Sequence, residues 1–290
     1  NLGIECYHLT FMIKLILLKF DRQENVMSRY SDHRKAKVVL NEIDQNRHKY
    51  LIIHYACESF FDTNGATPKI TSIAVKNFEN GQTDLFAIHK IAELHNISFN
   101  QIINNYAMLE KELLANFFDF VDKHNEKIWI HWNMRDSNFG FKAIEQRFKV
   151  LQGSPTIIPD DHKIDLSSLF IKLYGKGYID NPRILSLMNF NHISRHNFLD
   201  GKQEADAFTK EKFVELSFSN SSKVDLFSNF LVQCIDGKLK TKSKFFETYG
   251  NIPIGIYDWA LEKPTGKFIF WIINLLIGGL IGAWISNLVS

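Results

Sequence analysis

The pattern of apolar and polar positions predicts strands in the first half of the chain, with helices between and after them. Short β-rich apolar runs bounded by polar residues predict strands. These runs cover 50–60, 70–78, 83–89 and 127–132. Asn80-Gly81 separates the second run from the third, which predicts a hairpin turn.

Apolar residues at helical spacing occupy most of the remaining body and predict helices. The predicted helices cover 105–124, 138–151, 162–175, 183–190 and 203–216, with an amphipathic helix at 223–236. Strands that come first and are then interrupted by helices predict an α/β fold, with a mixed sheet flanked by helices.

The last apolar stretch of the chain, from Phe268 to Val289, carries no charged residue. As a helix it is roughly 30 Å long, which matches the hydrocarbon core of a bilayer. Lys267 stands just before it. We therefore predict one transmembrane helix with residues 268–289 in the lipid bilayer, in a single-pass, tail-anchored protein whose body faces the cytoplasm. The alternative is a buried core helix.

Small residues lie four apart on one face of this stretch, a spacing that can pair helices in lipid and predicts a homodimer. They are Gly278, Gly279, Gly282 and Ala283. Upstream, a lysine-bearing segment at 238–244 is interpreted either as a contact for anionic lipid head groups or as a plain solvated run.

The predicted domains follow from these segments. Residues 1–26 hold a short apolar stretch interrupted by lysines, which is a poor signal peptide. Met27 precedes a charged, helix-like stretch and is a candidate native start, so 1–26 are left out of the fold prediction. The domains are an N-terminal extension over 1–49, an α/β domain over 50–216, a helical and basic linker over 217–266 and the anchor over 267–290.

Charge and cysteine content exclude some functions. The formal net charge is +2 for 290 residues, so nucleic-acid binding would need a local groove and not a global basic field. Cys6, Cys57 and Cys234 are far apart and form neither a disulfide framework nor a zinc spacing, which fits a reducing cytosol.

Acidic residues follow several predicted elements. Glu58 ends the first strand and Asp136 follows the fourth, while Asp165 precedes or starts a helix and Glu204 lies on a later one. Carboxylates that converge from several elements can hold two divalent ions roughly 4 Å apart. Each of them taken alone is more often solvated, so their order is the informative feature.

In this order the motifs resemble those of the DEDD 3′–5′ exonuclease superfamily. The stretch ACES (56–59) matches the family's Asp-x-Glu-Thr/Ser, and HWNMRD (131–136) matches its His-Asn-x-x-Phe-Asp. HKIDLSSLF supplies Asp165, RILSLMNFNHIS supplies a Ser-Leu pair, and His196 precedes Glu204-Ala205. The resemblance covers residues 50–210.

The resemblance implies a ribonuclease H-like fold that cleaves DNA or RNA from the 3′ end with Mg²⁺ or Mn²⁺. The ions would be held by Glu58, Asp136, Asp165 and Glu204, and His131 or His196 would act as general base. Ala56 departs from the pattern, because it replaces the family's first metal-bridging Asp, a change that usually abolishes activity. His54 lies on the same strand face and is interpreted either as a substitute metal ligand or as a core histidine.

Two further alternatives stay open. Trp132 and Arg135 are suited to stacking and phosphate contacts, or else form a core residue and a surface ion-pair partner. Three functional hypotheses follow. The first is a membrane-tethered exonuclease, for which a role in defence against foreign nucleic acid rests on analogy alone. The second is an inactive pseudonuclease that binds nucleic acid or nucleotides or serves as a scaffold, and the third is a structural α/β protein.

Overall fold

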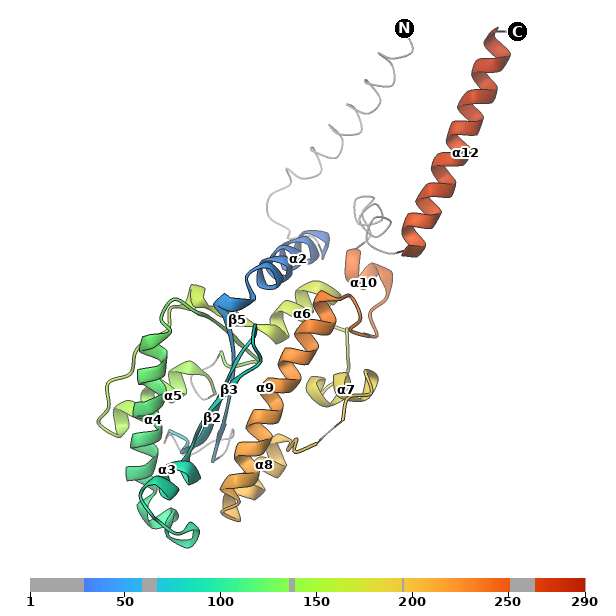
Figure 1. Cartoon of the computed structure of the whole chain (residues 1–290). Coiled ribbons are helices and arrows are strands. Elements are labelled where there is room, and N and C mark those ends of the chain that lie inside the picture. The colour runs from blue at the N-terminus through green and yellow to red at the C-terminus, as the bar shows by residue number, and fades with distance from the viewer. Residues whose placement is uncertain (1–28, 59–66, 136–138, 195, 251–263, 290) are drawn as a thin grey trace. The chain divides into compact units, whose positions relative to one another are not determined.

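A computed structural model of the chain describes residues 29–58, 67–135, 139–194, 196–250 and 264–289. Its strands are β1 (Tyr50–Cys57), β2 (Ile70–Asn77), β3 (Thr83–Ala87), β4 (Ile128–His131) and β5 (Lys163–Asp165). They form one sheet in the order β3-β2-β1-β4-β5 (Figure 1). β2 runs antiparallel to β1 and β3, whereas β4 is parallel to β1 and β5 is parallel to β4. The predicted α/β class with a mixed sheet is confirmed, and the topology is consistent with a ribonuclease H-like fold.

Helices follow and separate the strands. The described helices are α2 (Arg29–Gln45), α3 (Ile88–Leu94), α4 (Tyr106–Lys123), α5 (Phe141–Val150), α6 (Leu166–Tyr174), α7 (Arg183–Phe190), α8 (Gly201–Thr209), α9 (Phe213–Ile235), α10 (Phe245–Tyr249) and α12 (Pro264–Val289). Helices α4, α5 and α7 lie where the apolar spacing predicts them. The segment predicted as one helix over 162–175 begins instead as β5, and the two helices predicted at 203–216 and 223–236 are α8 followed by the long α9.

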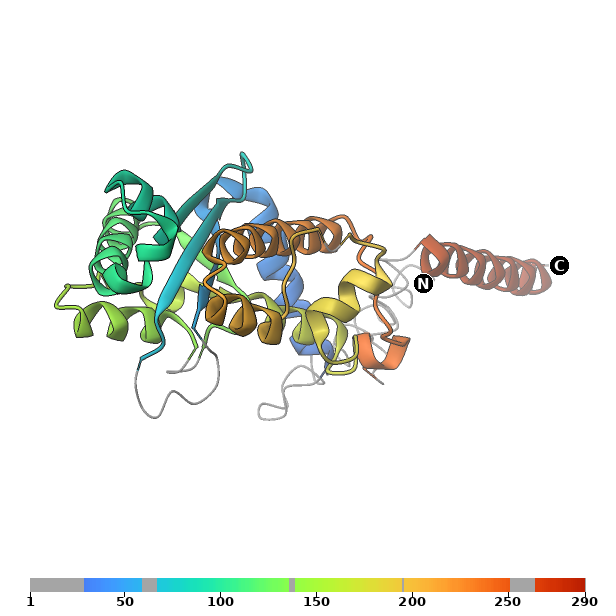
Figure 2. The same cartoon turned by 90° about the horizontal axis from the view of Figure 1, so that it is seen from below.

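The central strand β1 is buried along its whole length. Leu51, Ile53 and Tyr55 belong to the hydrophobic core that also contains residues of α4 and α5. On the other face α9 packs against β1 and β2 (Figures 1 and 2). A strand covered on both faces reads as a continuous apolar run, which is why this segment is the clearest strand signal in the sequence.

The hairpin predicted at Asn80-Gly81 joins β2 to β3. The side-chain oxygen of Asn77 accepts hydrogen bonds from the backbone N–H groups of Glu79 at 2.9 Å and Asn80 at 3.2 Å. Gly81 has φ = +76°, a backbone conformation that glycine adopts at little energetic cost because it has no Cβ atom. The turn therefore fixes the register of the antiparallel side of the sheet.

The chain divides into two compact units. The larger unit holds the sheet and comprises Val38–Ile171 and Ile179–Thr241. The smaller unit gathers the described parts of 1–37, 172–178 and 242–290. Inside it, the Arg29 guanidinium donates to the backbone carbonyls of Lys172 at 2.6 Å and Leu173 at 2.7 Å. The domain limits proposed from the sequence stay a prediction.

The prediction of a tail-anchored membrane protein is wrong. α12 forms in the predicted region, but none of the helices that the structure describes has the length and apolar character needed to cross a bilayer. A span requires about 20 consecutive, predominantly apolar residues. The predicted lipid contact of residues 268–289 and the homodimer through the small residues around Gly278 and Gly279 both depended on that span, and neither is supported.

Two sequence predictions concern residues outside the described part of the chain. One is the start at Met27, within the undescribed residues 1–28. The other is the acidic residue Asp136, within the undescribed residues 136–138. Both stay predictions.

Candidate functional site

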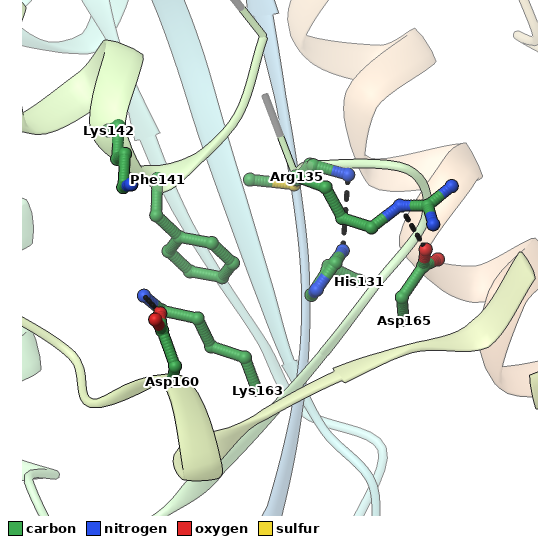
Figure 3. A pocket seen from close by; sticks show the side chains of 8 residues that line it. His131, Arg135, Phe141, Lys142, Asp160, Lys163 and Asp165 are labelled. Atoms are coloured by element: carbon green, nitrogen blue, oxygen red, sulfur yellow. Dashed lines mark hydrogen bonds and ion pairs between the residues drawn. The ribbon is translucent and has the colours of Figure 1, made fainter. Parts of the chain in front are cut away.

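A cavity lies at the carboxyl ends of β4 and β5, where parallel strands commonly present side chains to ligands. His131 and Asp165, the last residues of these strands, are partners across the ladder. The cavity has a volume of about 300 Å³, close to the lower limit of ~300 Å³ usual for small-ligand sites. It is lined by His131, Met134, Arg135, Phe141, Lys142, Asp160, Lys163 and Asp165 (Figure 3).

His131 presents a neutral N–H donor to this cavity. Its Nδ1 accepts a hydrogen bond from the backbone N–H of Met134 at 3.1 Å, so the ring proton is carried by Nε2. Burial lowers the pKa of His131 to about 4, against the raising effect of the Asp165 charge and together with the lowering effects of Arg135 and Lys163. The imidazole is therefore uncharged at neutral pH. Its ring packs edge to face with Phe141, with the ring centroids 5.4 Å apart.

Asp165 is committed to contacts within the chain. Its Oδ1 accepts hydrogen bonds from the backbone N–H groups of Ser167 at 3.0 Å and Asn133 at 3.1 Å. Its Oδ2 accepts from the Ser168 hydroxyl at 3.0 Å and pairs with Arg135 Nε at 2.6 Å. The carboxylate thus caps the first turn of α6 and anchors the loop that follows β4.

Arg135 has several contacts within the chain. Besides the pair with Asp165, its guanidinium donates to the Ser168 hydroxyl at 3.0 Å and to Asn133 Oδ1 at 3.1 Å. Trp132 is buried, and its ring stacks on Phe227 of α9 at 5.5 Å. Of the two interpretations of this stretch, the core tryptophan and the ion-paired arginine are the ones observed.

The opposite wall of the cavity carries two lysines. Lys163 pairs with the exposed Asp160 at 2.9 Å, and its ammonium lies 5.0 Å from the Phe141 ring centroid. Lys142 is exposed and extends from the start of α5 to the same cavity (Figure 3). Within the part of the chain that the structure describes, Lys142 forms no hydrogen bond or ion pair. It is therefore a cation that can meet an incoming anion without first breaking a contact.

The other predicted acidic ligands lie apart from the cavity. Glu58 follows β1, is partly exposed and lies 3.8 Å from Lys69 Nζ. Glu204 on α8 is completely buried, and its Oε1 lies 2.6 Å from Lys223 Nζ of α9. Ala56 contributes no ligand. Each of the acids placed here, like Asp165, faces a cation of the chain itself.

The predicted histidines His54 and His196 do not line the cavity. His54 is buried, and its ring centroid lies 6.0 Å from that of Phe139 and 5.6 Å from that of Phe227, with edge-to-face geometry in both pairs. Burial, and then the Lys223 charge, lower the pKa of His54 well below its usual range. His196 is exposed, and its backbone carbonyl accepts a hydrogen bond from Ser222 at 2.9 Å.

The described residues do not fit the two-metal site that the resemblance implies. No three His, Cys, Asp or Glu side chains in the described ranges are grouped to hold a metal ion. Of the four acids named from the sequence, Glu58, Asp165 and Glu204 have lysine or arginine partners, and Asp136 is not described.

Sequence reasoning missed the lysines that decide the character of these sites. Lys223 had a usable signal, because the apolar residues Phe227 and Phe230 lie four and seven positions after it and so share its helix face. A lysine on such a face needs a buried partner. Lys142 and Lys163 had no comparable signal, since single lysines in a polar stretch usually face solvent.

Comparisons with known proteins add little. No protein-family model matches the chain, and no curated protein matches it. Among solved structures, the catalytic domain of Mos1 mariner transposase is similar at 10% identity with a TM-score of 0.25, covering 76% of this chain and 97% of that chain. A TM-score this low leaves the functional argument to the geometry of the chain itself.

Proposed function

We propose that this protein binds a nucleotide unit of a single nucleic-acid strand in the cavity at the carboxyl ends of β4 and β5, and that it does so without two-metal hydrolysis. The observation that carries the proposal is the cavity itself, which joins cations, a neutral N–H donor and an apolar wall at the carboxyl ends of parallel strands. This is the pseudonuclease alternative of the sequence analysis, without a membrane tether.

The polar groups of the cavity suit a phosphate. Lys142 offers an ammonium without a hydrogen bond or ion pair among the described residues, and Lys163 offers a second one that is paired with the exposed Asp160. The Nε2–H of His131 adds a neutral donor. Charge-assisted hydrogen bonds of this kind are the strong ones in phosphate recognition.

The apolar part suits the sugar and base of the same unit. Phe141 and Met134 line the cavity, and both are buried, so they form a wall of fixed shape. A volume of about 300 Å³ accommodates about one nucleotide and not a duplex. Single strands can present one unstacked unit to such a site.

The ion pairs favour binding over cleavage. A two-metal nuclease needs carboxylates that are free to take divalent ions, whereas Glu58, Asp165 and Glu204 each face a cation from the chain. Ala56 removes a further ligand from the pattern. A role in defence against foreign nucleic acid stays a prediction from analogy.

The binding test uses the full chain and fluorescence anisotropy with labelled single-stranded DNA and RNA in EDTA. We expect saturable binding that Lys142→Ala weakens about tenfold, the loss of one charged hydrogen bond. Lys149→Ala is the matched control, since Lys149 is exposed on the same helix and does not line the cavity, and it should bind as the unmutated chain does. Equal affinities for all three proteins would refute the proposed site.

The same strands incubated with Mn²⁺ test cleavage. We expect them to remain intact. Shortening from the 3′ end by the unmutated chain, absent in Glu58→Gln/Asp136→Asn, would establish the exonuclease hypothesis instead. Failure to bind either strand in EDTA or Mn²⁺ would favour a structural α/β protein.

A further inference from the structure

Two carboxylates line the cavity at the carboxyl ends of β4 and β5, and they differ in what they can still accept. Both oxygens of Asp165 already accept hydrogen bonds from backbone or side-chain groups of the chain. Asp160 uses Oδ1, which lies 2.9 Å from Lys163 Nζ. Its Oδ2 forms no hydrogen bond or ion pair with the residues that the structure describes. Of these two acids, Asp160 is the one that retains a free acceptor.

Asp160 brings a negative charge into a cavity whose other groups suit an anion. The hydrogen bond from Lys163, and then the charges of Lys163 and Lys142, lower the pKa of Asp160, so its carboxylate is ionised at neutral pH. A carboxylate beside a bound phosphate repels that phosphate. The repulsion weakens binding unless the ligand also carries a donor that the carboxylate can accept.

The groups on this side of the cavity follow one another in space (Figure 3). The Lys163 ammonium lies 5.0 Å from the ring centroid of Phe141 and 2.9 Å from the Asp160 carboxylate. A nucleotide unit has matching parts, namely a base that packs on an aromatic ring, a phosphate that pairs with ammonium groups and a sugar that joins the two. A sugar hydroxyl is therefore the donor that this carboxylate would meet.

The sugar is also what separates RNA from DNA. Within a strand the 3′ and 5′ oxygens are esterified, so a deoxyribose unit has no hydroxyl to donate, whereas a ribose unit keeps its 2′-hydroxyl. Carboxylates accept hydrogen bonds from ribose hydroxyls in dinucleotide sites, and the 2′-hydroxyl lets a protein tell RNA from DNA. We propose that Asp160 accepts a hydrogen bond from the 2′-hydroxyl of the bound unit, so that the cavity prefers RNA. This rests on the proposed function and names its ligand class.

The test measures the affinity of the full chain in EDTA for three labelled strands of equal length. They are oligouridylate, oligodeoxyuridylate and 2′-O-methyl oligouridylate, which share one base and differ only in the sugar, and the 2′-O-methyl group cannot donate. We expect the RNA to bind about fivefold more tightly than either other strand, the effect of one hydrogen bond. Asp160→Ala should bind the RNA as weakly as the DNA. Its DNA affinity should not fall, because a repulsive charge is lost.

Asp161→Ala is the matched control. Asp161 is exposed, is the next residue in the sequence and does not line the cavity, so this variant loses the same charge and should keep the preference. Equal affinities of the unmutated chain for the RNA and the 2′-O-methyl strand would overturn the proposal, and this reading needs no variant. A preference for RNA that persists in Asp160→Ala would also overturn it. Failure of all three strands to bind would refute the proposed function itself, and the preference with it.

Discussion

Asp165 Oδ2 and Arg135 Nε, which lies in the loop that follows β4, form an ion pair at 2.6 Å. The pair links the end of β5 to a loop whose Met134 N–H fixes the tautomer of His131. Asp165, which the resemblance assigns to metal binding, therefore organises the cavity as a helix cap and ion-pair partner.

Replacement of Asp165 by alanine should lower the free energy of unfolding by about 2 kcal/mol. The variant loses the cap of α6, typically about 1 kcal/mol, and leaves Arg135 without its charged partner. Urea unfolding measures the change. Asp160→Ala is the control, because the Asp160 side chain is 92% exposed and its removal should leave the free energy of unfolding nearly unchanged. Equal effects of the two variants would contradict the structural role of Asp165.

The pair formed by Glu110 of α4 and Arg147 of α5 should be sensitive to the loss of either charge. Glu110 is completely buried; its Oε1 accepts from Arg147 Nε at 2.8 Å and from the backbone N–H of Ile70 at 2.6 Å. Arg147→Met should lower the free energy of unfolding, measured in urea, by about 3–5 kcal/mol, because it leaves a buried carboxylate without its partner.

The double variant Glu110→Gln/Arg147→Met is the control for that prediction. It keeps an acceptor for Ile70 and removes both charges, so it should be clearly more stable than the single variant. A single variant within about 1 kcal/mol of the unmutated chain would show that the pair contributes little.

The fold could be predicted from the sequence wherever an element is long and covered by other elements. β1 reads as a continuous apolar run because both of its faces are buried, and α4 shows clear helical spacing because one of its sides packs on the core. β5 could not be predicted, since it contains only the three residues Lys163–Asp165. A strand so short shows no periodic pattern of apolar residues in the sequence. It is recognised as a strand only by its pairing with β4.

The site could be predicted only in part. His131 and Asp165, both named as candidate site residues from the sequence, lie beside each other because they end neighbouring strands, while the roles expected of them stay a prediction. The ion-pair partners could not be assigned, because Lys223 meets Glu204 only through the packing of α9 on α8. The charge state of an acid depends on such contacts, so motif order alone overestimates catalytic potential.

The salt dependence of strand binding should reveal the phosphate contact of Lys142. On single strands, each neutralised phosphate contributes about 0.7 to the slope of log K against log salt concentration. Lys142→Ala should therefore reduce the slope by about 0.7, whereas Lys149→Ala should leave it unchanged. Anisotropy titrations from low to moderate salt measure the slopes. A reduced affinity with an unchanged slope would mean that Lys142 acts through folding and not through a phosphate.

Stability should fall on acidification because His131 is buried in its neutral form. Its folded pKa of about 4 lies below the ordinary value of 6.5, so between these limits the unfolded chain binds more protons than the folded one. The contribution is complete above about pH 6.5 and is lost as the pH falls towards 4, with a maximum of about 3 kcal/mol.

His131→Asn isolates this contribution, because asparagine keeps an acceptor near the position of Nδ1 but does not titrate. In urea unfolding between about pH 4.5 and 7.5, the unmutated chain should lose more stability on acidification than the variant does. His54, which is also buried with a lowered pKa, titrates in both proteins and cancels in the difference. Parallel curves would mean that His131 is protonated as readily in the folded chain as in the unfolded one. Below pH 6.5 the imidazole would then be a charged donor in the cavity, and phosphate binding would strengthen as the pH falls through 6.5.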